Sequence, residues 1–140
     1  MSDRQPETST TQRTSRQLPE AVADALRRAR TLENLATGAD RRRAWQVTRE
    51  LIQATLSAGY PATLVASALG VTSGSIRNRA GGSGFLDATE LLELADLSTT
   101  TLDQWELDGR LPHTKFDGID RRMYAAQDII LGLARQDSIH

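Results

Sequence analysis

The chain has 140 residues, of which 39% are hydrophobic and 25% charged, with a net charge of −1, no cysteine and two histidines. This length and composition exclude a large multidomain enzyme, a membrane-spanning protein and a metal site built on cysteine or histidine. We therefore expect a mainly helical cytoplasmic protein without a cofactor. The net charge conceals a basic half, with twelve arginines against seven acidic residues in 1–82, and an acidic half, with five basic against eleven acidic residues in 83–140. That asymmetry predicts one surface facing a polyanion and another facing solvent or a protein.

The N-terminal part is predicted to be an arm followed by two helices. Residues 1–17 are rich in Ser, Thr, Gln and Arg and lack the apolar side chains that would offset the entropy of ordering, so we expect a flexible arm. Apolar residues recur at three- and four-residue steps from Leu18 and predict an amphipathic helix that ends at Gly38. A second helix is predicted from an N-cap at Asp40 to the break at Gly59–Pro61. The two helices are expected to pack as a hairpin.

The next elements are short and have the spacing of a helix-turn-helix. We predict a helix over Ala62–Leu69, a tight turn at Gly70–Val71 and a second helix from an N-cap at Thr72 to about Ala80. Ala66 is small enough to let the two helices approach, and the glycine of the turn can adopt a positive φ.

The second of these helices carries residue types that read DNA on its outward positions. Arginine can pair with guanine, asparagine with adenine, and serine with bases or phosphates. No acidic residue lies between Leu51 and Leu86, so little in this segment would repel a phosphate backbone. The predicted DNA-binding residues of this helix are Ser73, Gly74, Ser75, Arg77, Asn78 and Arg79.

Gly81–Gly84 is predicted to be a flexible linker between two modules, residues 18–80 and 85–140, because Gly-Gly-Ser-Gly breaks both helices and strands. In the second module, Asp87 and Glu90 form a capping-box signal for one helix, and a turn ending at Ser98 leads into another.

A hairpin and a last helix are predicted to complete the second module. Asp117–Gly118 indicates a two-residue turn between strands at 113–116 and 119–123, and the helix covers about 125–135. The aromatic residues on apolar-facing positions, which we expect in the core, are Trp105, Phe116 and Tyr124. The predicted fold class is therefore mainly α, with tandem helix-turn-helix modules, the second bearing a small β-hairpin wing.

The second module also carries a set of short motifs: Ala88-Thr89-Glu90-Leu91, Ser98, Trp105, Gly109-Arg110-Leu111-Pro112, Arg121-Arg122, Tyr124 and Asp128. With them, residues 85–134, roughly a third of the chain, resemble the winged helix-turn-helix of the MerR and phage-excisionase superfamily. The resemblance implies that the second helix enters the major groove and that the wing contacts an adjacent backbone or minor groove. It implies base contacts from Thr99, Thr100, Thr101 and Gln104, and phosphate contacts from Arg110, Lys115, Arg121 and Arg122.

The sequence departs from this family in its predicted recognition helix. Asp103 stands where relatives commonly have a basic residue, Glu106 and Asp108 follow it, and Leu92 replaces a usual alanine. Acidic groups near phosphates weaken DNA binding, although an aspartate can accept a hydrogen bond from cytosine. Both a DNA-reading and a protein-directed face therefore stay open for this helix.

The sequence as a whole predicts a sequence-specific double-stranded DNA-binding transcriptional regulator, a repressor of phage or mobile-element type. Two linked modules could read an asymmetric site as a monomer. One alternative is an excisionase that bends DNA beside an integrase, and another is an adaptor whose acidic second module binds a protein partner. Catalysis is not predicted, because no nucleophile has a matching base, and the carboxylates of Glu90, Glu93 and Asp96 fall on exposed helical positions.

Overall fold

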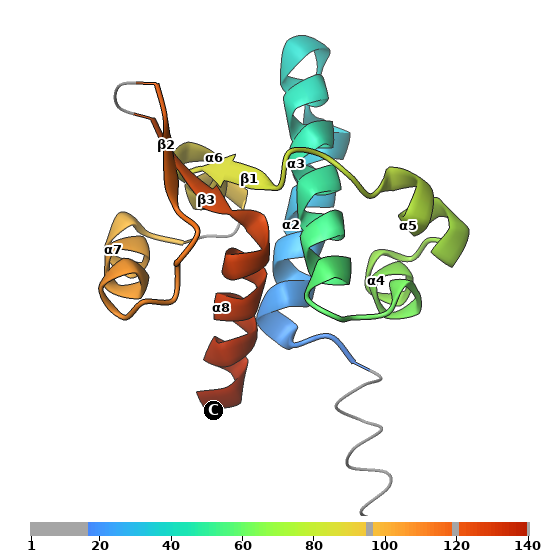
Figure 1. The fold of residues 1–140 in the computed structure, drawn as a ribbon. Coiled ribbons are helices and arrows are strands. Elements are labelled where there is room, and N and C mark those ends of the chain that lie inside the picture. The colour runs from blue at the N-terminus through green and yellow to red at the C-terminus, as the bar shows by residue number, and fades with distance from the viewer. Residues whose placement is uncertain (1–16, 95–96, 119–120, 140) are drawn as a thin grey trace, which may run out of the picture.

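Figure 1 shows the computed structural model, which describes residues 17–94, 97–118 and 121–139; most of the predicted arm lies outside the described residues. The elements in chain order are α2 (Glu20–Leu35), α3 (Gly38–Ser57), α4 (Ala62–Leu69), α5 (Ser73–Arg79), β1 (Phe85–Asp87), α6 (Ala88–Leu94), α7 (Thr99–Leu107), β2 (Lys115–Asp117), β3 (Arg121–Ala125) and α8 (Ala126–Ile139). The fold is mainly helical with a small antiparallel sheet, which confirms the predicted fold class.

Three helices form the centre of the molecule. The long helices α2 and α3 run side by side as an antiparallel hairpin, and α8 lies along them (Figure 1). Leu26 of α2, Leu51 of α3 and Ile130 of α8 are each at most 1% exposed and belong to one hydrophobic cluster. This shared cluster also takes in residues of the shorter elements, so both predicted modules contribute to the same core.

The boundary between the first two helices differs from the prediction. The first helix ends at Leu35, and Gly38 begins the second helix instead of ending the first. Gly38 has a φ of +59°, a conformation open to glycine that lets the chain enter α3 directly. Asp40 therefore lies in the first turn of α3 and is not its N-cap.

The predicted helix-turn-helix of α4 and α5 is confirmed in its local detail. Gly70 ends α4 with a φ of +69°, and the next residue, Val71, donates its backbone N–H to the Ala66 carbonyl at 3.0 Å. The Thr72 hydroxyl caps α5 by accepting a hydrogen bond from the Ser75 backbone N–H at 3.1 Å. Turn and cap together fix how α5 leaves α4.

The second half holds the two predicted caps and one unpredicted strand. The Asp87 and Glu90 carboxylates each accept the other residue's backbone N–H at 2.8 Å, and Ser98 caps α7. The strand β1 pairs with β3, so the sheet order is β1-β3-β2. The three residues of β1 directly precede α6, so in the sequence they merge with the helix-start signal and predict no strand.

The hairpin wing of β2 and β3 differs from the prediction at Asp117. Asp117 pairs with Arg121 across the hairpin and so belongs to β2, not to the turn. Residues 119–120 of the predicted second strand lie outside the described residues. Trp105 and Tyr124 are buried as predicted, whereas Phe116 is 63% exposed because it lies on the projecting wing (Figure 1). Its expected place in the core is therefore wrong.

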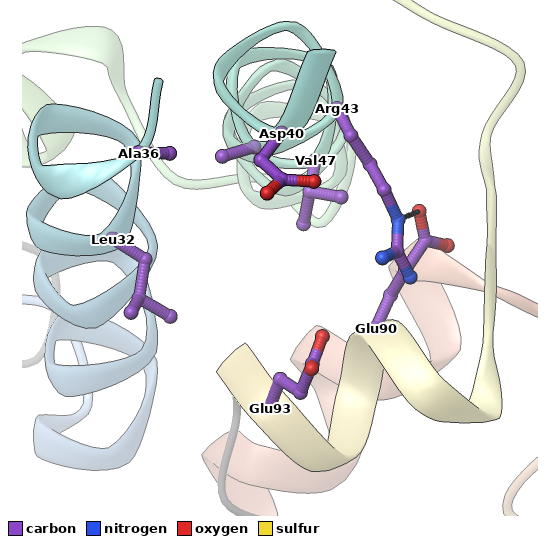
Figure 2. Close-up of a pocket in the computed structure, with 8 residues that line it drawn as sticks. Leu32, Ala36, Asp40, Arg43, Val47, Glu90 and Glu93 are labelled. Atoms are coloured by element: carbon purple, nitrogen blue, oxygen red, sulfur yellow. Dashed lines mark ion pairs between the residues drawn. The ribbon is translucent and has the colours of Figure 1, made fainter. Parts of the chain in front are cut away.

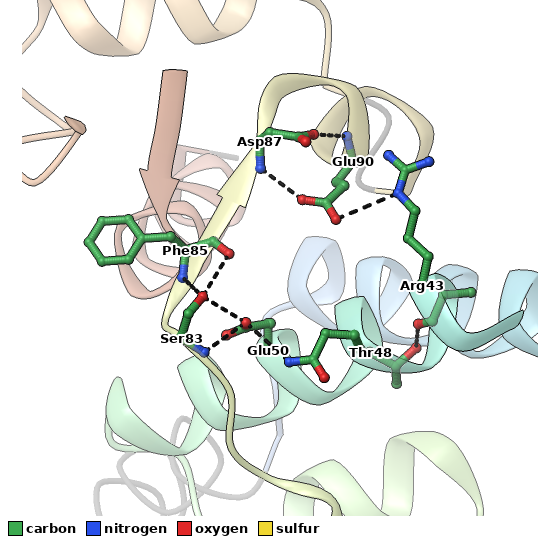
Figure 3. A network of polar contacts seen from close by, with 9 residues as sticks. Arg43, Thr48, Glu50, Ser83, Phe85, Asp87 and Glu90 are labelled. Atoms are coloured by element: carbon green, nitrogen blue, oxygen red, sulfur yellow. Dashed lines mark hydrogen bonds and ion pairs between the residues drawn. The ribbon is translucent and has the colours of Figure 1, made fainter. Parts of the chain in front are cut away.

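Segment 81–84 is held against α3, unlike the flexible linker that the glycine content predicts. The buried Glu50 carboxylate accepts hydrogen bonds from the Ser83 backbone N–H at 2.9 Å, the Ser83 hydroxyl at 2.9 Å and the Gly84 N–H at 2.7 Å (Figure 3). Gly82 has a φ of +113°, and a Cβ at that position would lie 2.4 Å from the carboxyl carbon of Glu50. The lack of a side chain at Gly82 therefore lets the backbone of this segment lie close to α3.

Candidate nucleic-acid interface

Helix α5 presents a polar, partly basic face to solvent. Gly74, Ser75, Arg77 and Asn78 are exposed and Ser73 is half-buried, while Ile76 is 1% exposed and anchors the opposite side of the helix. The structure thus brings five of the six residues predicted for this helix onto or beside its accessible face. A guanidinium and a carboxamide on adjacent positions can donate and accept hydrogen bonds at base edges.

Arg79 is the exception, because its guanidinium is turned toward the core helices. Its Nη2 atom lies 2.9 Å from Oε1 of the buried Glu33 and donates to the Trp45 carbonyl at 3.1 Å. The same guanidinium stacks 4.8 Å from the centroid of the Trp45 ring. Arg79 follows Ile76 by three residues, so the helical period places both on the inward side. We therefore assign Arg79 to joining α5 with α2 and α3, instead of the base or phosphate contact predicted for it.

A second group of arginines, absent from the sequence-based prediction, lies on α3. We call Arg41, Arg42, Trp45 and Arg49 the arginine face of α3. Trp45 is 38% exposed, and the Arg49 guanidinium lies 5.5 Å from its ring centroid. The sequence shows three consecutive arginines at 41–43, which could have indicated a basic surface. It does not tell which of these arginines lie on the side of α3 that faces α5.

The outward face of α7 is polar and acidic. Thr99, Thr100 and Gln104 are exposed, but so are Asp103 and Asp108. The Gln104 amide donates to the Asp108 carboxylate at 3.0 Å, and the half-buried Thr101 hydroxyl lies 3.0 Å from the Ser98 hydroxyl. Two of the four predicted base-contacting side chains are therefore engaged within the helix and its cap.

The basic residues predicted for the wing are partly engaged within the protein. Arg122 Nη1 lies 2.8 Å from Oε1 of Glu106 on α7. A side-chain hydrogen bond with Tyr124 raises the pKa of Arg122, and attraction to Glu106 adds to that effect. Lys115 Nζ sits 4.0 Å from the centroid of the Phe85 ring. Arg110 is half-buried, and the side chain of Arg121 lies outside the described residues.

The two helix-turn-helix units do not form one surface. Figure 1 places α5 on one side of the central helices α2, α3 and α8, and α7 with the wing on the other. One straight duplex lying along α5 therefore does not meet α7.

A cavity of about 480 Å³ lies at the junction of α2, α3 and α6 (Figure 2). It has an apolar wall and a charged rim, lined by Leu32, Ala36, Asp40, Arg43, Ala44, Val47, Glu90 and Glu93. Arg43 Nε lies 3.8 Å from Oε2 of Glu90, so an ion pair spans from α3 to α6 along the cavity. Three carboxylates against one guanidinium make this cavity unsuitable for a phosphate group.

No protein-family model, curated protein or solved structure matches the chain. In the part of the chain that the structure describes, no helix has both the length and the apolar character needed to cross a membrane. Within the same residues, no three His, Asp or Glu side chains are grouped so as to hold a metal ion. The resemblance to the MerR and excisionase superfamily stays a prediction that rests on the motifs of residues 85–134.

Proposed function

We propose that the chain binds double-stranded DNA with sequence preference through α5 and acts as a transcriptional regulator, a repressor of phage or mobile-element type. The observation that carries the proposal is the exposed face of α5, where Ser75, Arg77 and Asn78 stand on a capped helix held by a tight turn from α4. Repression requires only that the protein occupies its site. A cytoplasmic location, where DNA is accessible, belongs to the same proposal.

Electrostatics favours α5 over α7 as the reading helix. The segment between Leu51 and Leu86 has no acidic residue, whereas α7 exposes Asp103 and ends beside the exposed Asp108. A duplex carries about one negative charge per 1.7 Å of its axis, so exposed carboxylates against it reduce affinity. This contrast supports reading by α5 alone, with the α7 surface left for another contact.

The opposite placement of α5 and α7 bears on the proposed asymmetric site. Reading by both units requires a duplex that bends around the central helices, and such bending costs on the order of 1–6 kcal/mol. The excisionase alternative requires strong bending of the duplex. A gel-mobility measurement of the bend angle therefore separates an excisionase from a repressor. We expect a weakly bent duplex for a repressor that reads through α5.

Arg77→Ala tests the role of α5. We expect this change to weaken binding to the preferred duplex by about 1–3 kcal/mol and to relax the preference at one base pair, because a bidentate arginine–guanine pair is lost. Fluorescence anisotropy on the preferred duplex and its single-base variants gives both quantities. Arg135→Ala, which removes an exposed arginine from α8, is the matched control and should bind as the parent does. Equal binding by Arg77→Ala and the parent contradicts the assignment.

Asp103→Asn tests whether α7 reads bases. Because we place the duplex on α5, we expect this change to keep the preferred sequence and to leave affinity unchanged or slightly higher. Selection of bound duplexes with parent and variant measures the preference directly. A changed preference at one position means that Asp103 contacts a base, and unchanged DNA binding leaves the acidic surface of Asp103 and Asp108 for a basic protein partner.

A further inference from the structure

We propose that the arginine face of α3 binds the phosphate backbone of the duplex beside the site read by α5. The inference rests on the function proposed above and adds a second contact surface, formed mainly by Arg41 and Arg42. Its ligand is the sugar–phosphate backbone, without base identity, so this surface contributes affinity and register but no sequence preference.

The members of this face share one side of α3. Positions 41, 42, 45 and 49 fall within about 100° of one another around a helix with 3.6 residues per turn. Arg41 and Arg42 are both exposed, and within the described residues neither guanidinium has a hydrogen-bond or ion-pair partner. They are therefore available to an outside anion. Arg43, the next residue, is turned away toward Glu90 at the cavity shown in Figure 2.

Trp45 connects this face to α5. Its ring packs against the guanidinium of Arg79, the last residue of α5, and its carbonyl accepts a hydrogen bond from the same side chain. Arg41 lies one turn away from Trp45, about 6 Å along the axis of α3. The two arginines are thus set at a short, fixed distance from the C-terminal end of the proposed reading helix.

The local charge balance favours an anion at this surface. The nearby carboxylate of Glu33 is 6% exposed and already paired with Arg79, so it presents little negative charge to solvent. Asp40 is exposed at the start of α3, but it lies about 140° around the helix from Trp45, and its carboxylate lines the cavity beside Arg43 (Figure 2). A polyanion that follows α5 toward the Trp45 side of α3 therefore meets Arg41 and Arg42, whereas Asp40 lies toward the cavity.

The test compares four single substitutions in full-length protein, using the duplex selected by the parent and an unrelated duplex of equal length. Arg41→Ala and Arg42→Ala should each weaken binding to both duplexes about fivefold to tenfold at 0.1 M salt and lower the slope of log K against log salt by about 0.9. Arg43→Ala, one residue along the same helix, and Arg135→Ala are the charge-matched controls and should keep the parental slope.

Trp45 supplies a second readout, the solvent exposure of this face, measured with the duplex at saturating concentration. It is 38% exposed, whereas the other tryptophan, Trp105, is 4% exposed, so acrylamide quenching reports mainly on Trp45. Adding the selected duplex should reduce quenching if the backbone covers this face.

Two results distinguish failure of this inference from failure of the proposed function. If the parent binds duplex DNA while Arg41→Ala and Arg42→Ala keep its slope, or if Arg43→Ala lowers the slope equally, the α3 contact is wrong and reading by α5 stands. If the parent binds no duplex DNA at all, the proposed function and the α3 contact both fail.

Discussion

Replacing Trp105 with alanine is expected to lower the free energy of unfolding by about 4 kcal/mol, the usual range for removing a large buried aromatic side chain. Trp105 is 4% exposed and holds α7 against α8. A Cβ added to Gly132 of α8 would lie 2.6 Å from Cζ3 of the indole, so the ring rests directly on the backbone of that helix. Truncation to alanine therefore removes the packing between α7 and α8 and leaves a cavity there.

Urea denaturation followed by circular dichroism measures this change. Leu107→Ala is the matched control, because Leu107 ends the same helix and is 82% exposed. It should change stability by less than about 0.5 kcal/mol. A loss below about 1 kcal/mol for Trp105→Ala would show that α7 is not held by this contact.

The second large effect is expected for Glu50→Gln, which should lower the free energy of unfolding by about 3 kcal/mol. The carboxylate accepts from the backbone N–H groups of Ser83 and Gly84 and from the Ser83 hydroxyl. Its Oε2 atom also accepts from the Gln46 amide at 3.3 Å, while Oε1 accepts the Gly84 N–H (Figure 3). Both carboxylate oxygens are therefore used. A glutamine has one oxygen and one NH₂ group, and whichever way it turns, a donor then faces a donor.

The control for Glu50→Gln is Glu20→Gln, the same chemical change at a side chain that is 71% exposed. Thermal unfolding of the two variants separates the loss of these hydrogen bonds from the loss of a charge. Backbone amide exchange at Ser83 and Gly84 gives a local reading and should accelerate only in Glu50→Gln. Equal stability of the two variants would mean that segment 81–84 is not held by Glu50.

Features with local causes were predictable from the sequence. The turn at Gly70, the cap at Thr72 and the reciprocal bonds of Asp87 and Glu90 each depend on residues within about four positions of one another, and each is present. The apolar periodicity likewise predicted the long helices, although it misplaced their junction at Gly38.

Features with distant causes were not predictable in this way. Arg79 was expected to face outward because nothing near it in sequence can pair with it; Glu33 lies 46 residues away. The glycines of segment 81–84 indicated flexibility, but Glu50, 33 residues before Ser83, holds the segment in place. Both errors arise from buried carboxylates whose partners only the tertiary fold brings close. The same limit concealed the arginine face of α3, since its link to α5 depends on Trp45 and Arg79.

Selection of bound duplexes from a random pool shows whether α5 reads DNA. The parent and Asp103→Asn should enrich the same short motif, Arg77→Ala should relax that motif at one position, and affinity for it should fall steeply with salt. If the parent enriches no duplex, or if Asp103→Asn alters the motif while Arg77→Ala leaves it unaffected, reading by α5 is wrong.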